Sequence, residues 1–315
     1  MIQSAYSQTH EAGSEKNSPF GFSVYALTGI LYGQGEEIVY WNSEESDYKS
    51  QLLWDIKPLA YAGVGLSFSV NENRDALGFY TNASFRAGIP LRTGKMEDRD
   101  WQLSSDHSIL TNYSVHENYT TKAFLADLAL GISLPLKHKE RILAFFKLEV
   151  ALSYMYFDWM ARNGYYQYDP NSIQPWNPSY PSYPLYGDVC AYYQHWLAVS
   201  PGIAVTIPIR SRWVVEVSLN TAPGLIWNWS LDKHIDARTE YQDYPTGGVL
   251  LEGRGEVSYS FNTHLALAGR LSFRHIGGSR GDGLQIGGRY PGWYYNTAGA
   301  GFRALDAGLT LKVFF

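Results

Sequence analysis

The chain has a single cysteine, Cys190, among its 315 residues. An intrachain disulfide is therefore excluded, and so is a metal site built from several cysteines. Only 17% of the residues are charged, the net charge is −5, and lysine and arginine form no cluster. A mildly acidic chain without a basic cluster offers no electrostatic surface for a phosphate backbone, so we expect no nucleic-acid partner.

Long apolar segments are missing as well. No uninterrupted hydrophobic run approaches the roughly twenty residues that a membrane-spanning helix needs. This excludes a transmembrane helix but leaves a transmembrane β-barrel open, because barrel strands carry a much weaker signal per segment. Aromatic residues are abundant, at 16% of the chain with 25 tyrosines. At this length the chain could form one large all-β domain or two ordinary domains.

The clearest pattern in the chain is the alternation from Trp213 to His234. A strand directs successive side chains to opposite faces, so one face here is apolar and the other small or polar. The apolar face carries Trp213, Val215, Val217, Leu219, Leu225, Trp227, Trp229 and Leu231. The alternation is about twice as long as an ordinary strand of a globular protein. A strand of this length with one apolar face is typical of contact with lipid.

Similar alternation recurs along the whole chain and predicts about ten strands. Their ranges are Phe20–Tyr40, Gln51–Val70, Leu77–Asp100, Thr121–Leu136, Ile142–Asp158, Val189–Ile209, Trp213–His234, Val249–Phe261, His264–His275 and Thr297–Phe315. Loops are expected near Asp236–Gly248 and over the glycine-rich Gly277–Gly292. We predict an all-β fold, a ten-stranded antiparallel transmembrane β-barrel with long extracellular loops and short periplasmic turns. Residues 1–18 are expected to form a flexible N-terminal segment, and residues 19–315 a single barrel domain.

Two further features support a membrane barrel over a soluble β-sandwich or calycin-like barrel, both of which also alternate. The last strand ends on an aromatic residue, Phe315, as outer-membrane barrels do. Charged residues occupy the inward positions of several strands: Arg86, Arg92, Lys147, Glu149, Glu216, Arg254, Glu256 and Arg270. Such charges would be very costly in a dry core unless paired, whereas a polar lumen can hydrate and pair them. Because no secretory signal is visible after Met1, we expect a chain that is already processed.

Two short motifs carry the candidate chemistry. Asp98 and Asp100 are two residues apart, so their carboxylates point the same way in a strand, and Asp232 and His234 share this spacing. Both pairs lie at the loop end of a predicted strand with inward parity, so we expect them at one mouth of the barrel. Adjacent carboxylates resist double ionisation, and a histidine beside an aspartate can take a proton from water.

The segment MEDRDW (Met96–Trp101), followed by Ser104–Ser105, and the segment Asp232–His234 resemble the catalytic motifs of the omptins, outer-membrane aspartyl-type endopeptidases. The similarity extends to GILYGQGEEIVY in the first predicted strand, to SQLLWD (Ser50–Asp55) and to MARNGYYQY (Met160–Tyr168). This resemblance implies a ten-stranded barrel that cleaves polypeptides at the outer surface of a bacterial outer membrane. It requires no cofactor.

In the scheme that the resemblance implies, His234 is the general base and Asp232 orients it. Asp98 and Asp100 share a proton, position the attacking water and stabilise the oxyanion. Glu37 matches the family's acidic specificity residue, which pairs with a substrate arginine or lysine. The second acid of that pocket would fall at residue 230, which is a serine here, so selectivity for basic residues could be weaker or shifted.

The lipid contact of the family also differs. Omptins carry a cationic outer cluster that binds lipopolysaccharide phosphates, but the corresponding strand reads Leu152–Tyr156, and the later arginine is replaced by His195. We therefore expect no lipopolysaccharide clamp and no dependence on this lipid. We expect a monomer without a metal, with His107, His116 and His195 as loop or rim residues. The alternatives are a catalytically silent barrel that acts as a surface adhesin, and a porin-like channel.

Overall fold

The computed structural model describes residues 19–44, 47–71, 75–139, 141–169, 173–235 and 237–315. The N-terminal segment 1–18, expected to be flexible, lies outside the described residues. The described residues contain no helix that is long and apolar enough to cross a membrane.

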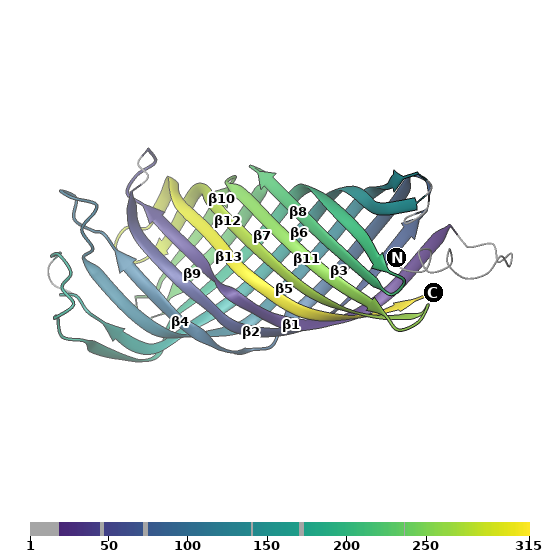
Figure 1. The fold of residues 1–315 in the computed structure, drawn as a ribbon. Coiled ribbons are helices and arrows are strands. Elements are labelled where there is room, and N and C mark those ends of the chain that lie inside the picture. The colour runs from purple at the N-terminus through teal and green to yellow at the C-terminus, as the bar shows by residue number, and fades with distance from the viewer. Residues whose placement is uncertain (1–18, 45–46, 72–74, 140, 170–172, 236) are drawn as a thin grey trace.

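Among the described residues, thirteen antiparallel strands form one closed sheet (Figure 1). They are β1 (Phe20–Tyr40), β2 (Tyr48–Val70), β3 (Gly78–Gly88), β4 (Leu91–Asp100), β5 (Asn112–His138), β6 (Arg141–Tyr166), β7 (Tyr183–Arg210), β8 (Trp213–Pro223), β9 (Ile226–His234), β10 (Thr239–Thr246), β11 (Val249–Ser260), β12 (Leu265–Gly287) and β13 (Gly292–Phe314). β1 pairs with both β2 and β13, and β7–β8 and β10–β12 pairings complete the ring. The predicted antiparallel all-β barrel is confirmed.

The difference between thirteen strands and the predicted ten comes from three interruptions. β3 and β4 both pair with β2 and β5, and are separated at Ile89–Pro90. β8 and β9 both pair with β7 and are separated at Gly224, which has a φ of 77°. β10 and β11 both pair with β12 and are separated at Gly247–Gly248. If each interrupted pair is counted as one barrel strand, ten remain.

Two predicted loops are strands instead. Within Asp236–Gly248, residues Thr239–Thr246 form β10, and within the glycine-rich Gly277–Gly292, β12 continues to Gly287. The two segments pair with each other over their full length, from Thr239↔Gly287 to Thr246↔Arg280. Glycine and polar residues are tolerated in these strands because they project past the apolar part of the barrel, where water replaces lipid.

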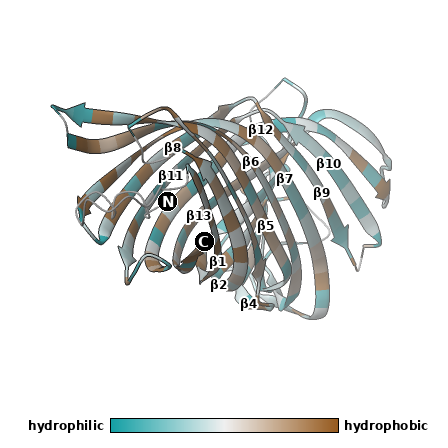
Figure 2. Ribbon diagram, turned by 90° about the vertical axis from the view of Figure 1, so that its right-hand side faces the viewer, coloured by the Kyte–Doolittle hydropathy of each residue, from teal (hydrophilic) through white to brown (hydrophobic). Residues whose placement is uncertain are grey.

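The outer face is apolar around the end at which β1 begins and β13 ends. Along β1 the last exposed large hydrophobic side chain is Tyr32, and along β9 it is Trp229. Along β11, which runs back from the other end, the first is Val249. The strands show the expected interleaving of hydrophobic and hydrophilic residues (Figure 2). We call this apolar part the belt, and the opposite end, where β4 and β9 lie in Figure 1, the mouth.

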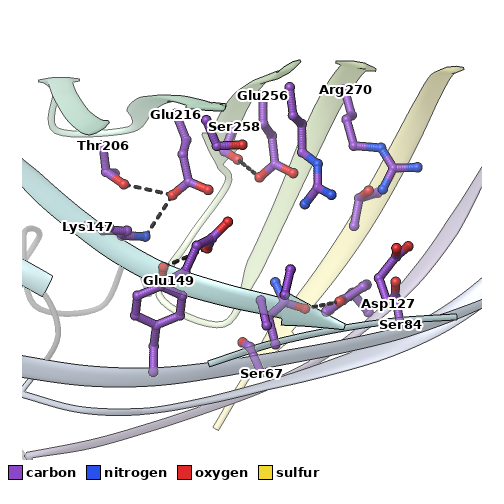
Figure 3. A pocket seen from close by; sticks show the side chains of 18 of the residues that line it. Ser67, Ser84, Asp127, Lys147, Glu149, Thr206, Glu216, Glu256, Ser258 and Arg270 are labelled. Atoms are coloured by element: carbon purple, nitrogen blue, oxygen red, sulfur yellow. Dashed lines mark hydrogen bonds and ion pairs between the residues drawn. The ribbon is translucent and has the colours of Figure 1, made fainter. Parts of the chain in front are cut away.

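The inner face holds charged side chains that are paired. Arg86 binds both Asp127, at 2.6 Å, and Asp306, at 2.5 Å. Arg274 joins Asp127 to Glu252. Around a polar cavity of about 130 Å³ further along the lumen, Glu216 accepts hydrogen bonds from Lys147 and Thr206, each at 2.7 Å (Figure 3). The inward charges predicted from the sequence therefore have polar partners in the lumen, and among them Lys147 and Glu216 pair with each other.

Arg92 is an exception, because its predicted inward position is wrong. Its side chain is 56% exposed and pairs with Glu117. The alternation shifts once at Ile89–Pro90 and again at an irregularity beside Gly94, which has a φ of 117°. The two shifts cancel, so Asp98 shares the inward parity of Arg86 although Arg92 between them does not.

Candidate active site

A cavity of about 520 Å³ opens at the mouth, and both predicted residue pairs line it. Asp98 and Asp100 enter from the end of β4, and Asp232 and His234 from the end of β9. Glu37 of β1 lines the same cavity. All of these residues lie past the end of the belt on their own strands, so the cavity is on the aqueous side of the barrel.

The two aspartates of β4 have different neighbours. Asp100 lies between Ser50 and Asn112 on the flanking strands, and it accepts a hydrogen bond from Gln102 Nε2 at 3.0 Å. Asp98 lies between Leu52 and Ser114, and its Oδ1 is buried without a donor among the described residues.

This difference decides which carboxyl holds a proton. Burial and the neighbouring Asp100 raise the pKa of Asp98 well above its usual value. Burial also raises the pKa of Asp100, but hydrogen bonds from Ser50, Gln102 and Asn112 oppose the shift. Asp98 should therefore keep its proton to higher pH than Asp100.

Asp232 and His234 form a tight pair. His234 Nε2 lies 2.7 Å from Asp232 Oδ2, and because a carboxylate only accepts, Nε2 carries the hydrogen. The Cys190 thiol donates to the other oxygen, Oδ1, at 2.6 Å. Asp232 raises the pKa of His234 to about 9, and Asp98 and Asp100 add to the shift. Among the described residues His234 Nδ1 has no partner, so it is available to a water molecule in the cavity.

Two further carboxylates lie deeper in the cavity. Glu37 is 2% exposed, and its Oε2 has no donor in the described part of the chain. Asp243 of β10 is 6% exposed and lines the same cavity. Burial raises the pKa of both, with Asp232 as the next cause for each. The cavity is thus lined by two further carboxyl groups that burial favours in the neutral form.

Below the cavity, large side chains fill the barrel. We call this set the aromatic layer: Trp54, Phe157, Trp159, Tyr192 and Phe302. Trp54 stacks on Tyr192 at 5.3 Å between ring centroids, and Phe157 stacks on Phe302 at 5.4 Å. All five are buried. The layer packs between the cavity at the mouth and the charged lumen.

One group at the site could hold a cation. The ligand atoms of Cys190, Asp232 and His234 lie within 4.8 Å of one another. Thiolate, imidazole and carboxylate are ligands that zinc accepts. Two hydrogen bonds already join the three residues, and a bound metal would have to replace them.

The structure brings together all five residues that the sequence indicated: Glu37, Asp98, Asp100, Asp232 and His234. Two neighbours of these residues, Cys190 and Asp243, were not predicted from the sequence. Cys190 was considered only for disulfides and metals, and its position opposite His234 follows only from strand register. Asp243 fell in a segment predicted to be a loop, although Thr239, Tyr241 and Asp243 alternate with polar residues and could have indicated a strand.

The omptin family model matches residues 18–313 of this chain. The plasminogen activator of Yersinia pestis is 30% identical over 155 residues, which cover 48% of this chain and 46% of that protein, so the match spans about half the length of the relative. The crystal structure of the outer membrane protease OmpT from Escherichia coli is similar with a TM-score of 0.79, over 97% of this chain and 100% of that chain, at 16% identity. The chain belongs to the omptin family and is a β-barrel protein of the bacterial outer membrane.

Proposed function

We propose that this chain is an endopeptidase that cleaves polypeptides at the cell surface, at or near basic residues. Residues 19–315 act as one barrel domain, and the protein works as a monomer without a cofactor. The observation that carries the proposal is the meeting of Asp98 and Asp100 with Asp232 and His234 across one water-accessible cavity beyond the belt.

The geometry supports an aspartyl-type mechanism in which water is the nucleophile. His234 Nδ1 takes a proton from a water molecule, while Asp232 holds the ring through Nε2. The hydroxide attacks the peptide carbonyl carbon, and the oxyanion that forms accepts a hydrogen bond from the protonated Asp98. Asp100 holds the water on its other side. The proton on His234 then passes to the leaving amine, and the peptide bond breaks.

The relatives agree with this assignment at a coarser level. One is named for the activation of plasminogen and the other is described as an outer membrane protease. The basic-residue preference rests on the carboxyl groups that line the cavity, where Glu37 can pair with a guanidinium or ammonium group.

The test uses the full chain, refolded in detergent, and peptides that contain paired arginines or lysines. Cleavage should be lost in Asp98→Ala and His234→Ala. It should persist in Asp106→Asn, an exposed loop acid whose carboxylate accepts hydrogen bonds from Ser108, and in His275→Ala, an exposed histidine of β12. Equal turnover in all four variants would identify a contaminating protease, and a folded wild type that cleaves nothing would overturn the proposal.

The alternatives predict different results. A surface adhesin gives no reason for an aspartate pair and a hydrogen-bonded Asp–His pair around one cavity. A porin-like channel requires an open lumen, whereas the aromatic layer fills it. Binding of host molecules that is unchanged by His234→Ala, without any cleavage, would favour the adhesin.

We also propose that activity does not depend on lipopolysaccharide. On the outer face, the residues expected to clamp its phosphates are aromatic or neutral. Tyr154 bonds to His195 at 2.8 Å, and the His195 ring packs at 4.5 Å against both Tyr156 and Trp229. These four positions offer aromatic rings, and none of the four residues carries a guanidinium or ammonium group. Stimulation of the refolded enzyme by added lipopolysaccharide would contradict the proposal.

A further inference from the structure

We propose that Asp243 is a specificity-determining residue, which together with Glu37 forms the anionic pocket for an arginine or lysine side chain of the substrate. The inference rests on the proposed function and deepens it. It assigns to a residue of β10 the second carboxylate that position 230 of β9 does not supply.

Strand register places the two positions side by side. Asp243 is the Cα partner of Ser230 on one side and of Gly283 on the other. Both neighbours are small, so the carboxylate of Asp243 has room on the inner face. The second carboxylate, expected at position 230 of β9, is thus supplied by the paired position 243 on the neighbouring strand β10.

The direction of the side chain is set by the approach to Gly283. A Cβ atom added at Gly283 would lie 2.8 Å from Asp243 Oδ1 and 3.6 Å from Ala298 of β13. The carboxylate therefore extends over β12 toward β13, whose Ala300 is the partner of Glu37 on β1. Asp243 reaches toward Glu37 and away from Ser230, and any side chain at position 283 would block it.

These two acids differ from the buried acids of the lumen, because no ion pair to either of them is found among the described residues. Asp127, Glu252 and Asp306 of the lumen each bind at least one arginine. Within the described residues, Glu37 and Asp243 form no ion pair, and Glu37 Oε2 has no donor at all. A buried acid pair without a counter-ion is costly, and a cation from outside would relieve the cost.

The ligand chemistry follows from this geometry. A substrate guanidinium presents several N–H donors in one plane and can bond to two carboxylates at once, and an ammonium group can bridge them less specifically. Both acids are held near the neutral form by burial, so the cation displaces protons when it binds. A neutral side chain of the same shape gains neither contact.

The experiment compares two peptides that differ only in arginine or its neutral isostere citrulline at one position. In the wild type, kcat/KM should favour the arginine peptide, and Asp243→Asn should reduce that ratio by about 10- to 100-fold, as expected for a lost charge-assisted hydrogen bond. The matched control is Glu240→Gln, which removes an acid from the other face of β10, where it pairs with Lys233. It should leave the ratio unchanged.

A second comparison transfers the carboxylate from position 243 of β10 to position 230 of β9. Asp243→Ser should lose the preference, and the double variant Ser230→Asp/Asp243→Ser should recover most of it. This pair decides the question even if Asp243→Asn fails to fold. A preference that survives in both Asp243→Asn and Asp243→Ser would overturn the inference and leave the proteolytic function standing.

Binding measurements separate the two proposals. Calorimetry on the His234→Ala variant should show tighter binding of the arginine peptide than of the citrulline peptide, and the difference should vanish when Asp243→Asn is added. If that pattern is found while the wild type cleaves neither peptide, the pocket stands and the proposed protease function fails. Equal binding of both peptides to His234→Ala would overturn the pocket.

Discussion

Replacing Asp243 by asparagine should stabilise the folded barrel, and increasingly so as the pH rises. Burial, with a contribution from Asp232, raises the pKa of Asp243 from 3.8 to about 8. Between these two values the unfolded chain is ionised at this residue while the folded chain holds the proton. The wild type therefore loses stability as the pH rises through this range, by about 1.4 kcal/mol per pH unit.

The full loss is at most about 6 kcal/mol, reached above pH 8, and about half of it is already present at pH 6. Asparagine does not ionise, so the variant escapes this cost. The advantage of the variant over the wild type should grow by about 3 kcal/mol or less between pH 6 and pH 9. Glu37 and Asp232 line the same cavity and can share the bound proton with Asp243. The value of about 3 kcal/mol is therefore an upper bound.

Guanidinium unfolding in detergent micelles, followed by tryptophan fluorescence at the two pH values, measures this difference. Glu240→Gln is the control, because Glu240 is 39% exposed and paired with Lys233. Its unfolding midpoint should follow the wild type at both pH values. Parallel loss of stability in the wild type and Asp243→Asn, or a variant less stable than the wild type at pH 9, would refute the reasoning.

Two further predictions concern Asp100, which lines the cavity at the mouth, and Cys190, which bonds to Asp232. Asp100→Asn removes a charge that raises the pKa of His234. The rising limb of kcat/KM against pH should therefore move to lower pH by roughly half a unit to one unit. In the control Asp106→Asn the rising limb should stay where it is in the wild type. Cys190→Ala leaves Asp232 Oδ1 without its thiol donor and should cost about 1–3 kcal/mol of unfolding free energy, whereas Cys190→Ser keeps a donor and should cost less. Equal guanidinium midpoints for the two cysteine variants would contradict the second prediction.

Much of the barrel was predictable because side-chain alternation is a local property. The apolar positions of Trp213–His234 face outward as predicted, on both sides of the interruption at Gly224. Failures occur where alternation is shifted or hidden. Arg92 lies between two shifts of the side-chain alternation that the sequence does not mark. β10 lies in a polar segment that resembles a loop, because its outer face does not contact lipid and need not be apolar.

For the candidate site, spacing predicted which residues share a face, and the resemblance predicted which pairs meet. Register between distant strands could not be predicted, because it depends on where each interruption falls. The contact of Cys190 with Asp232 and the placement of Asp243 beside Ser230 both follow from register. Differences in protonation, such as that between Asp98 and Asp100, also depend on neighbours from other strands.

The aromatic layer has a consequence for the cell that carries this protein. A ten-stranded barrel with a hollow interior would let ions and small solutes leak past the outer membrane whenever it is abundant. Because stacked rings fill the interior, we expect the protein to conduct no ions, so that a cell could display many copies without losing its permeability barrier. Planar-bilayer recordings should show no conductance from the wild type. A measurable current should require the double variant Trp54→Ala/Trp159→Ala.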